Sequence, residues 1–130
     1  MKTGASLRVS EKAPKAFDFR FPREEKLKGR DEIRKVFSGR KGISCYGARL
    51  FLLRNGLPHN RIAFTFSRKF GNAVKRNRSR RLGREVYRHL RNELKPGFDM
   101  VLLIHPGPGR DDIQARMSQL RELFSRAGLL

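Results

Sequence analysis

The longest amphipathic pattern in this chain of 130 residues begins at Ala73 and continues until Lys95-Pro96-Gly97 interrupts it. At about 100° of rotation per residue, the apolar positions gather on one side of a helix; they are Leu82, Val86, Tyr87, Leu90 and Leu94. The opposite side is polar and basic over an arc of about 100°; it holds Asn77, Arg80, Arg81, Arg84, Arg88 and Arg91. The pattern predicts a helix with Asn72 as its N-cap and Gly83 as a weak interior position that costs about 1 kcal/mol relative to alanine.

Three other segments have the patterns of β-strands. Ile43–Leu53 and Arg61–Ser67 alternate between two faces, and the turn-forming residues Arg54–Asn60 separate them. Met100–Ile104 is a continuous apolar run, which is typical of a central strand buried on both faces.

Two further helices are expected. Asp31 is placed to cap a helix that ends near Ser38, and Asp111 or Asp112 to start the last one. In that last helix an apolar stripe faces the core; it consists of Ile113, Met117, Leu120, Phe124 and Ala127. The order α–β–β–α–β–α predicts a single α+β domain, and a helix between two strands implies at least one parallel pair.

The amino-terminal segment has a different character. We expect residues 1–22 to form a basic, disordered arm ahead of a folded domain at residues 23–130. The alternating Phe17, Phe19 and Phe21 leave two other interpretations open, a short strand or an aromatic hook onto the domain.

Charge gives the first indication of function. The chain has 31 Lys and Arg against 12 Asp and Glu, a formal net charge of +19. The basic residues are densest in Ser67–Arg84, which contains eight of them and no acid. Such a block suits a polyanion, of which nucleic acid is the abundant cellular example. The alternative is a merely solvated helix face, but exposed helices usually mix both charge signs.

The remaining residue types argue against an active site in this chain. A single cysteine, Cys45, excludes an intramolecular disulfide and argues against a cysteine zinc site. The histidines His59, His89 and His105 have no acid or cysteine at metal-ligand spacing. No apolar run approaches the roughly 18 residues of a membrane span, and no signal peptide is evident, so we expect a cytoplasmic protein with no small-molecule cofactor.

The basic block also resembles a family signature. SRKFGNAVKRNRSRRLGRE, Ser67–Glu85, is similar to the Arg-Asn-Arg signature of the bacterial ribonuclease P protein subunit. The similarity extends to Leu27–Phe37, to the strand before the signature and to the strand after it, from about Phe21 to the C-terminus.

The resemblance implies both a fold and an activity. The implied fold is an α-β-β-β-α-β-α sandwich like domain 2 of ribosomal protein S5, with a left-handed βαβ crossover, an exception to the usual right-handed rule. The implied activity is that of an endoribonuclease holoenzyme that removes the 5′ leader of precursor tRNA. In that family the RNA subunit is the catalyst, and it holds most of the Mg²⁺ together with the substrate. The implied partners are therefore the RNA subunit and the leader.

The resemblance also assigns roles to residues of this chain. Those matching the surface that contacts the RNA subunit are Arg68, Lys69, Lys75, Arg76, Asn77, Arg78, Arg80 and Arg81. Arg84 extends this set by helical geometry alone. A leader-binding cleft is implied at Ile33, Phe37, Phe51 and Ser67. Ile33 stands where the family commonly has phenylalanine, and Phe37 is equally suited to core packing. Two other functions stay open on charge alone: a non-catalytic RNA- or ribosome-associated protein, and a nonspecific DNA-coating protein.

Overall fold

The computed structural model describes residues 21–39, 41–45, 47–106 and 112–130. Its elements in chain order are η3 (Arg23–Glu25), α1 (Arg30–Ser38), β2 (Lys41–Cys45), β3 (Ala48–Arg54), β4 (Arg61–Phe66), α2 (Ala73–Leu90), η4 (Arg91–Glu93), β5 (Phe98–Ile104) and α3 (Ile113–Arg126). The α-β-β-β-α-β-α order that the resemblance implies is confirmed, as is the single α+β domain.

The strands form one sheet in the order β2-β3-β5-β4. The β2/β3 and β3/β5 pairs are antiparallel, whereas β4 and β5 are parallel. The predicted parallel pair is therefore confirmed, and α2 is the crossover between its strands. The left-handedness of that crossover stays a prediction.

The expectation of a single strand over Ile43–Leu53 is wrong. The segment folds into the hairpin of β2 and β3, in which Cys45 pairs with Ala48. Gly47 has a φ of 80°, a conformation that glycine adopts without a steric penalty. Both strands contribute to the core, through Ile43 and Cys45 in β2 and through Ala48, Leu50 and Leu52 in β3. The core-facing positions therefore shift from odd to even numbers at the turn, and a single alternation over the whole segment misses this shift.

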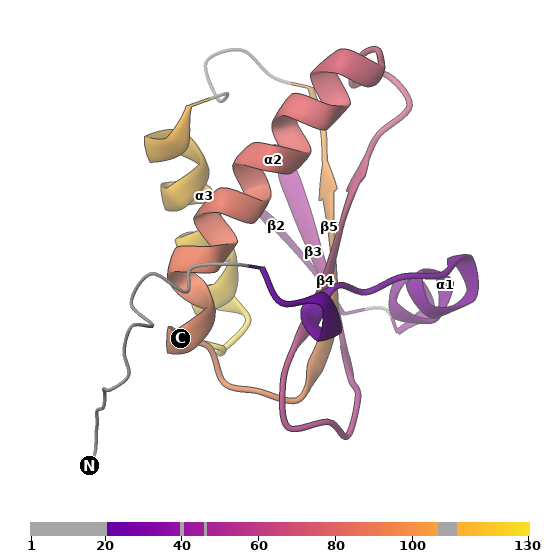
Figure 1. Cartoon of the computed structure of the whole chain (residues 1–130), viewed down its shortest axis with the longest axis vertical. Helices are drawn as coiled ribbons and strands as arrows, with labels where there is room; N and C mark the ends of the chain where they lie inside the picture. Colours follow the sequence, from indigo (N-terminus) through magenta and orange to yellow (C-terminus); the bar gives the residue numbers. More distant parts are fainter. Residues whose placement is uncertain (1–20, 40, 46, 107–111) are drawn as a thin grey trace.

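The two faces of the sheet carry different helices (Figure 1). The helices α2 and α3 pack on one face over a large core that includes Leu50, Met100 and Leu102. On the other face, here called the α1 face, Val36 of α1 packs with Val101 of β5. The central position of β5 explains why its apolar run is continuous, since its alternate residues are buried on opposite faces.

The close approach of α2 to the sheet depends on a glycine. A Cβ atom on Gly83 would lie 2.7 Å from Cε1 of Phe64 on β4. The buried face of α2 is therefore partly made of small residues, and consists of Ser79, Gly83, Val86, Tyr87 and Leu90. Leu82, expected on this face, is only half-buried, and Leu94 is buried but lies beyond the end of α2.

The helix starts agree with the sequence predictions in two cases out of three. Asn72 accepts a hydrogen bond from Lys75 N at 3.0 Å, and Asp112 accepts one from Ala115 N at 2.7 Å. The N-cap of α1 is Gly29, with no side-chain cap. The expectation that Asp31 caps α1 is wrong, because the helix begins one residue before it and places it in the first turn.

The start of α3 also differs from its predicted apolar stripe. Ile113 is exposed, while Arg116 and Gln119 are buried. Arg116 Nη2 donates to Ser79 Oγ of α2 at 3.2 Å. The first turns of α3 therefore contact α2 through polar side chains, which an apolar pattern does not report.

Most of the predicted N-terminal arm, residues 1–20, lies outside the described residues, so its disorder stays a prediction. Phe21, the last of the three alternating phenylalanines, packs on Tyr87 with ring centroids 5.3 Å apart.

Candidate nucleic-acid interface

The loop before α2 is held in place by Arg76. Its Nε donates to Gly71 O at 3.0 Å, and its Nη2 donates to the carbonyl oxygens of Ser67 and Arg68, each at 3.3 Å. Its side chain is half-buried by these contacts. Arg76 therefore fastens the segment 67–71 to the first turn of α2, and leaves Arg68 and Lys69 of that loop exposed.

Asn77 and Arg80 form a second fixed unit one turn later. Arg80 Nη1 donates to Asn77 Oδ1 at 2.8 Å, and Arg80 Cζ lies 5.2 Å from the centroid of the Phe66 ring. Phe66 in turn packs on Phe70 at 4.8 Å. An amide and an aromatic ring thus limit the guanidinium to one orientation, while the side chain stays partly exposed.

Arg84 is half-buried, as are Arg76 and Arg80. Its Cζ lies 5.9 Å from the centroid of the Phe21 ring. Burial, and then repulsion by Arg80, lower the pKa of its guanidinium. Arginine stays charged at physiological pH even so, so Arg84 adds positive potential beside Arg80.

The remaining predicted residues make up what we call the cationic surface: Arg68, Lys69, Lys75, Arg78 and Arg81. All five side chains are exposed. None of them forms an ion pair with an acid in the part of the chain that the structure describes. A hollow lined by Asn77, Arg80, Arg81 and Arg84 adjoins this surface. The structure therefore brings the predicted residues together, but in two classes: exposed cations, and residues that fix the loop and the helix surface.

The carboxyl-terminal part of the predicted arginine stripe is not free. Arg88 Nη2 pairs with Glu85 Oε1 at 2.5 Å, and both Nε and Nη2 of Arg91 contact the carboxylate of Glu25. Glu25 is buried in η3, so Arg91 joins η3 to the end of α2. The prediction of an uninterrupted arginine stripe is therefore wrong beyond Arg84, because Arg88 pairs with Glu85 one turn earlier in α2 and Arg91 pairs with Glu25, which is distant in sequence.

The predicted leader-binding residues lie mainly on the α1 face. Ile33, Phe37 and Phe51 pack together against buried Val36 and Val101. The Phe37 and Phe51 rings meet edge to face at 4.8 Å. All three side chains are half-buried, so they contribute to the core and also present apolar surface. A hollow beside α1 is lined instead by Asp31, Arg34, Lys35, Ser38, Gly39 and Leu53.

Ser67 is not part of this apolar cluster. It follows β4, and its N–H donates to Ile104 O at 3.0 Å. Its Oγ is buried and has no hydrogen-bond partner among the described residues, while its carbonyl accepts from Arg76. Ser67 therefore lies where the sheet passes into the loop that Arg76 fastens, and connects the α1 face to the start of α2.

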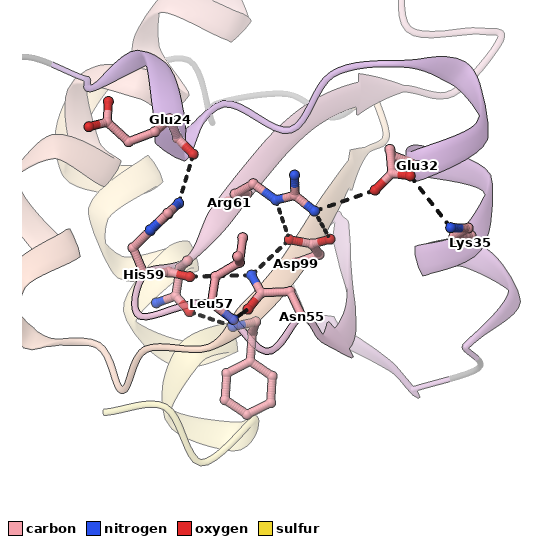
Figure 2. Close-up of polar contacts among 10 residues, drawn as sticks. Glu24, Glu32, Lys35, Asn55, Leu57, His59, Arg61 and Asp99 are labelled. Atoms are coloured by element: carbon pink, nitrogen blue, oxygen red, sulfur yellow. Dashed lines mark hydrogen bonds and ion pairs between the residues drawn. The ribbon is translucent and has the colours of Figure 1, made fainter.

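A polar network that sequence reasoning missed fixes one end of the α1 face (Figure 2). The carboxylate of Asp99, 5% exposed, accepts from Arg61 Nε at 2.7 Å and from Arg61 Nη2 at 2.6 Å. It also accepts from Asn55 Nδ2 at 2.9 Å. Arg61 Nη2 reaches Glu32 of α1 at 3.4 Å, so the network ties α1 to the starts of β4 and β5.

The bond to Asp99 is the main cause that raises the pKa of the Arg61 guanidinium. A signal for the network was present in the sequence. Arg61 is the first residue of β4 and Asp99 the second residue of β5, and the two face each other in the register of this parallel pair.

The described part of the chain contains neither a cluster of metal-ligating side chains nor a helix that could span a membrane. No group of three or more His, Cys, Asp or Glu side chains at residues 21–39, 41–45, 47–106 and 112–130 is arranged to hold a metal ion. Among the same residues, no helix combines the length and the apolar composition needed to cross a membrane.

Comparison with known proteins gives a consistent result. The family model described as Ribonuclease P matches residues 21–128. The chain is 32% identical over 114 residues to the ribonuclease P protein component of Dictyoglomus thermophilum, covering 86% of this chain and 95% of that protein. It is 32% identical over 104 residues to that of a Thermoanaerobacter species, covering 80% and 90%.

Solved structures agree with the fold. The RNase P protein from Thermotoga maritima superposes with a TM-score of 0.68 at 26% identity, over 78% of this chain and 96% of that one. The RNase P protein of Staphylococcus aureus has a TM-score of 0.70 at 19% identity, over 81% and 96%; at that identity the likeness supports the fold alone.

Proposed function

The chain belongs to the family of ribonuclease P protein components, and from this premise we propose that it works as the protein subunit of a ribonuclease P ribonucleoprotein in the cytoplasm. In this role it binds the catalytic RNA subunit and the 5′ leader of precursor tRNA, and it assists endonucleolytic removal of the leader. The observation that carries the proposal is the combination of a cationic surface, whose five cations form no ion pair with an acid among the described residues, with an aromatic cluster on the opposite face of the sheet.

The cationic surface is assigned to the RNA subunit. Its five exposed cations lie on one loop and the first turns of one helix, so they can neutralise several phosphates of one structured RNA. Counterion release would supply most of that affinity and make it strongly dependent on salt. Arg76, Asn77 and Arg80 are assigned to holding this surface in shape, because Arg76 and Arg80 donate to groups of the chain itself and the amide oxygen of Asn77 accepts from Arg80.

The α1 face is assigned to the leader. Single-stranded RNA is commonly bound by aromatic side chains that contact splayed bases beside a basic groove. Phe37 and Phe51 offer such rings, and Ile33 adds an aliphatic contact where the family commonly has another ring. Ser67 is assigned to the junction between the leader and the RNA subunit, since it lies between the two surfaces.

The chemistry of cleavage is assigned to the RNA. Mg²⁺ would stabilise charge on the attacking and leaving oxygens of the scissile phosphate. The described residues of this chain offer no cluster of ligands for that ion, so we assign Mg²⁺ mainly to the RNA subunit and the substrate. The protein contributes by positioning the leader.

Reconstitution tests the proposal. The chain is combined with a bacterial ribonuclease P RNA, and cleavage of a leader-bearing precursor is measured at low and at high Mg²⁺. We expect the protein to accelerate cleavage at low Mg²⁺ and to have a smaller effect at high Mg²⁺, where the ion alone screens the phosphates. Cleavage no faster than with RNA alone at low Mg²⁺ would refute the assignment and favour a non-catalytic RNA- or ribosome-associated protein.

A further inference from the structure

The α1 face is only partly covered by α1. In the row of the sheet under this helix, Phe51 pairs with Val101, which is fully buried. In the next row, Arg49 pairs with Leu103; Arg49 is exposed and Leu103 is half-buried. Since alternate residues of a strand share a face, Arg49 lies on the same face as Phe51, one step beyond the helix.

Arg49 has a defined position on this face. Its Cζ lies 5.3 Å from the centroid of the Phe51 ring. A Cβ atom on Gly42, in the neighbouring strand β2, would lie 2.5 Å from Arg49 Nε and 2.9 Å from its Nη2. The guanidinium therefore lies across the Gly42 backbone and against the Phe51 ring, in space that exists because residue 42 has no side chain.

The charge of Arg49 is available to a ligand. Arg49 makes no ion pair with any residue in the described ranges. Arg61, at the other end of the same face, is neutralised by Asp99 at 2.6 Å and by Glu32 at 3.4 Å. Arg49 is thus an arginine beside the aromatic cluster that has a ring to orient it and, among the described residues, no acidic partner.

We propose that Arg49 binds a backbone phosphate of the 5′ leader, next to the base that Phe51 and Phe37 contact. This inference rests on the proposed function. It adds a residue that contributes to the affinity for the leader independently of the nucleotide sequence of the leader. A guanidinium presents a planar fork that matches phosphate oxygens and can stack on a ring at the same time. Because Phe51 and Gly42 already fix the side chain, little rotamer freedom is lost when the phosphate binds.

The first test compares Arg49→Gln with the wild type in the reconstituted holoenzyme. Affinities for a leader-bearing precursor and for mature tRNA are measured at several salt concentrations. We expect Arg49→Gln to weaken precursor binding by about three- to tenfold and to lower its salt slope by about 0.7, the value for one phosphate of a single strand. Binding of mature tRNA and assembly with the RNA subunit should not change. Arg49→Lys should keep the salt slope and lose part of the affinity.

A second variant moves Arg49 without removing it. Gly42→Ala places a methyl group where the guanidinium lies, so precursor affinity should fall by a smaller factor than in Arg49→Gln. In the double variant the Gly42→Ala effect should disappear, because there is no guanidinium left to displace. Thermal melting of each variant checks that the domain is folded.

Three results would overturn the inference. Unchanged precursor affinity and salt slope in Arg49→Gln would do so, as would an equal loss of affinity for mature tRNA or for the RNA subunit. Additive effects in the double variant would show that Gly42 acts independently of Arg49. A wild-type holoenzyme with no preference for leader-bearing precursor would instead refute the proposed function on which the inference rests.

Discussion

Replacing Arg76 with lysine tests whether Arg76 positions the loop before α2 or only supplies a positive charge. Lysine keeps the positive charge and removes the planar fork that donates to the carbonyl oxygens of Ser67, Arg68 and Gly71. If Arg76 were only one more cation facing RNA, lysine would replace it well. Because its donors are used on the loop, we expect the loop to lose its fixed conformation and the cationic surface to lose its shape.

The size of the effect follows from the bonds lost. A lysine ammonium can reach one of the three carbonyl oxygens, so two hydrogen bonds are lost, each with a net contribution of about 0.5–1.5 kcal/mol. The side chain is only half-buried, so we take the lower part of this range, about 1 kcal/mol in total. That corresponds to about fivefold weaker binding of the RNA subunit.

The assay is a titration of the RNA subunit with protein at several salt concentrations. Arg76→Lys should bind about fivefold more weakly with an unchanged salt slope, because the charge is kept. The matched control is Arg78, which is exposed on the cationic surface. Arg78→Lys should bind almost like the wild type, whereas Arg78→Ala should lower the salt slope by about one unit. Equal behaviour of Arg76→Lys and Arg78→Lys would refute the positioning role of Arg76.

Three further predictions concern stability, each measured by urea unfolding. Gly83→Val should destabilise the domain by about 2 kcal/mol, because its side chain enters the space of the Phe64 ring and overpacking outweighs the gain in helix propensity; a stable variant would contradict the close helix–sheet contact. Asp99→Asn should cost about 2–3 kcal/mol because the Arg61 guanidinium loses its buried carboxylate partner, and a loss below 0.5 kcal/mol would show that the network is dispensable. Burial raises the pKa of Tyr87 above its ordinary value of 10.0, so above pH 10 the folded state keeps a proton that the unfolded state releases. The free energy of unfolding should therefore fall by about 1.4 kcal/mol per pH unit above pH 10, and less steeply in Tyr87→Phe. An identical alkaline slope in that variant would refute the raised pKa of Tyr87.

The sequence predicted best what is determined locally. The caps Asn72 and Asp112 were found because an Asn or Asp side chain bonds an N–H three residues ahead. The central strand β5 was found because a strand covered on both faces has a continuous apolar run. The prediction of Asp31 as the cap is wrong because α1 begins at Arg30, with Gly29 at the N-cap, so that Asp31 lies in the first turn of the helix.

The different contacts that the signature arginines make within the chain could not be predicted from the sequence. Arg76, Arg78 and Arg80 have the same side chain and similar neighbours in sequence. What distinguishes them is tertiary: carbonyl oxygens at the end of β4 lie near Arg76, and the Phe66 ring lies near Arg80. The family signature predicts these residues as one group, and only the fold separates the exposed cations from the half-buried donors.

The polar network and the Arg49 site also depend on strand pairing. Arg61 and Asp99 are 38 residues apart in sequence, and Arg49 and Gly42 become neighbours only through the β2/β3 hairpin. One continuous strand was expected over Ile43–Leu53, so Arg49 was placed within that strand and Gly42 before its start. The correct hairpin was therefore a condition for recognising Arg49.

The central claim is that this protein holds the leader in place on a catalytic RNA. The most direct test is the ratio of the affinities for leader-bearing precursor and mature tRNA, measured for the RNA subunit alone and for the holoenzyme at fixed salt and Mg²⁺. We predict that adding the protein raises the affinity for precursor at least tenfold while the affinity for mature tRNA changes less than twofold, since only the precursor has the leader that we propose binds the α1 face. A tenfold change is about 1.4 kcal/mol of leader contacts. Equal gains for both tRNAs would contradict the claim and leave a general RNA-binding protein.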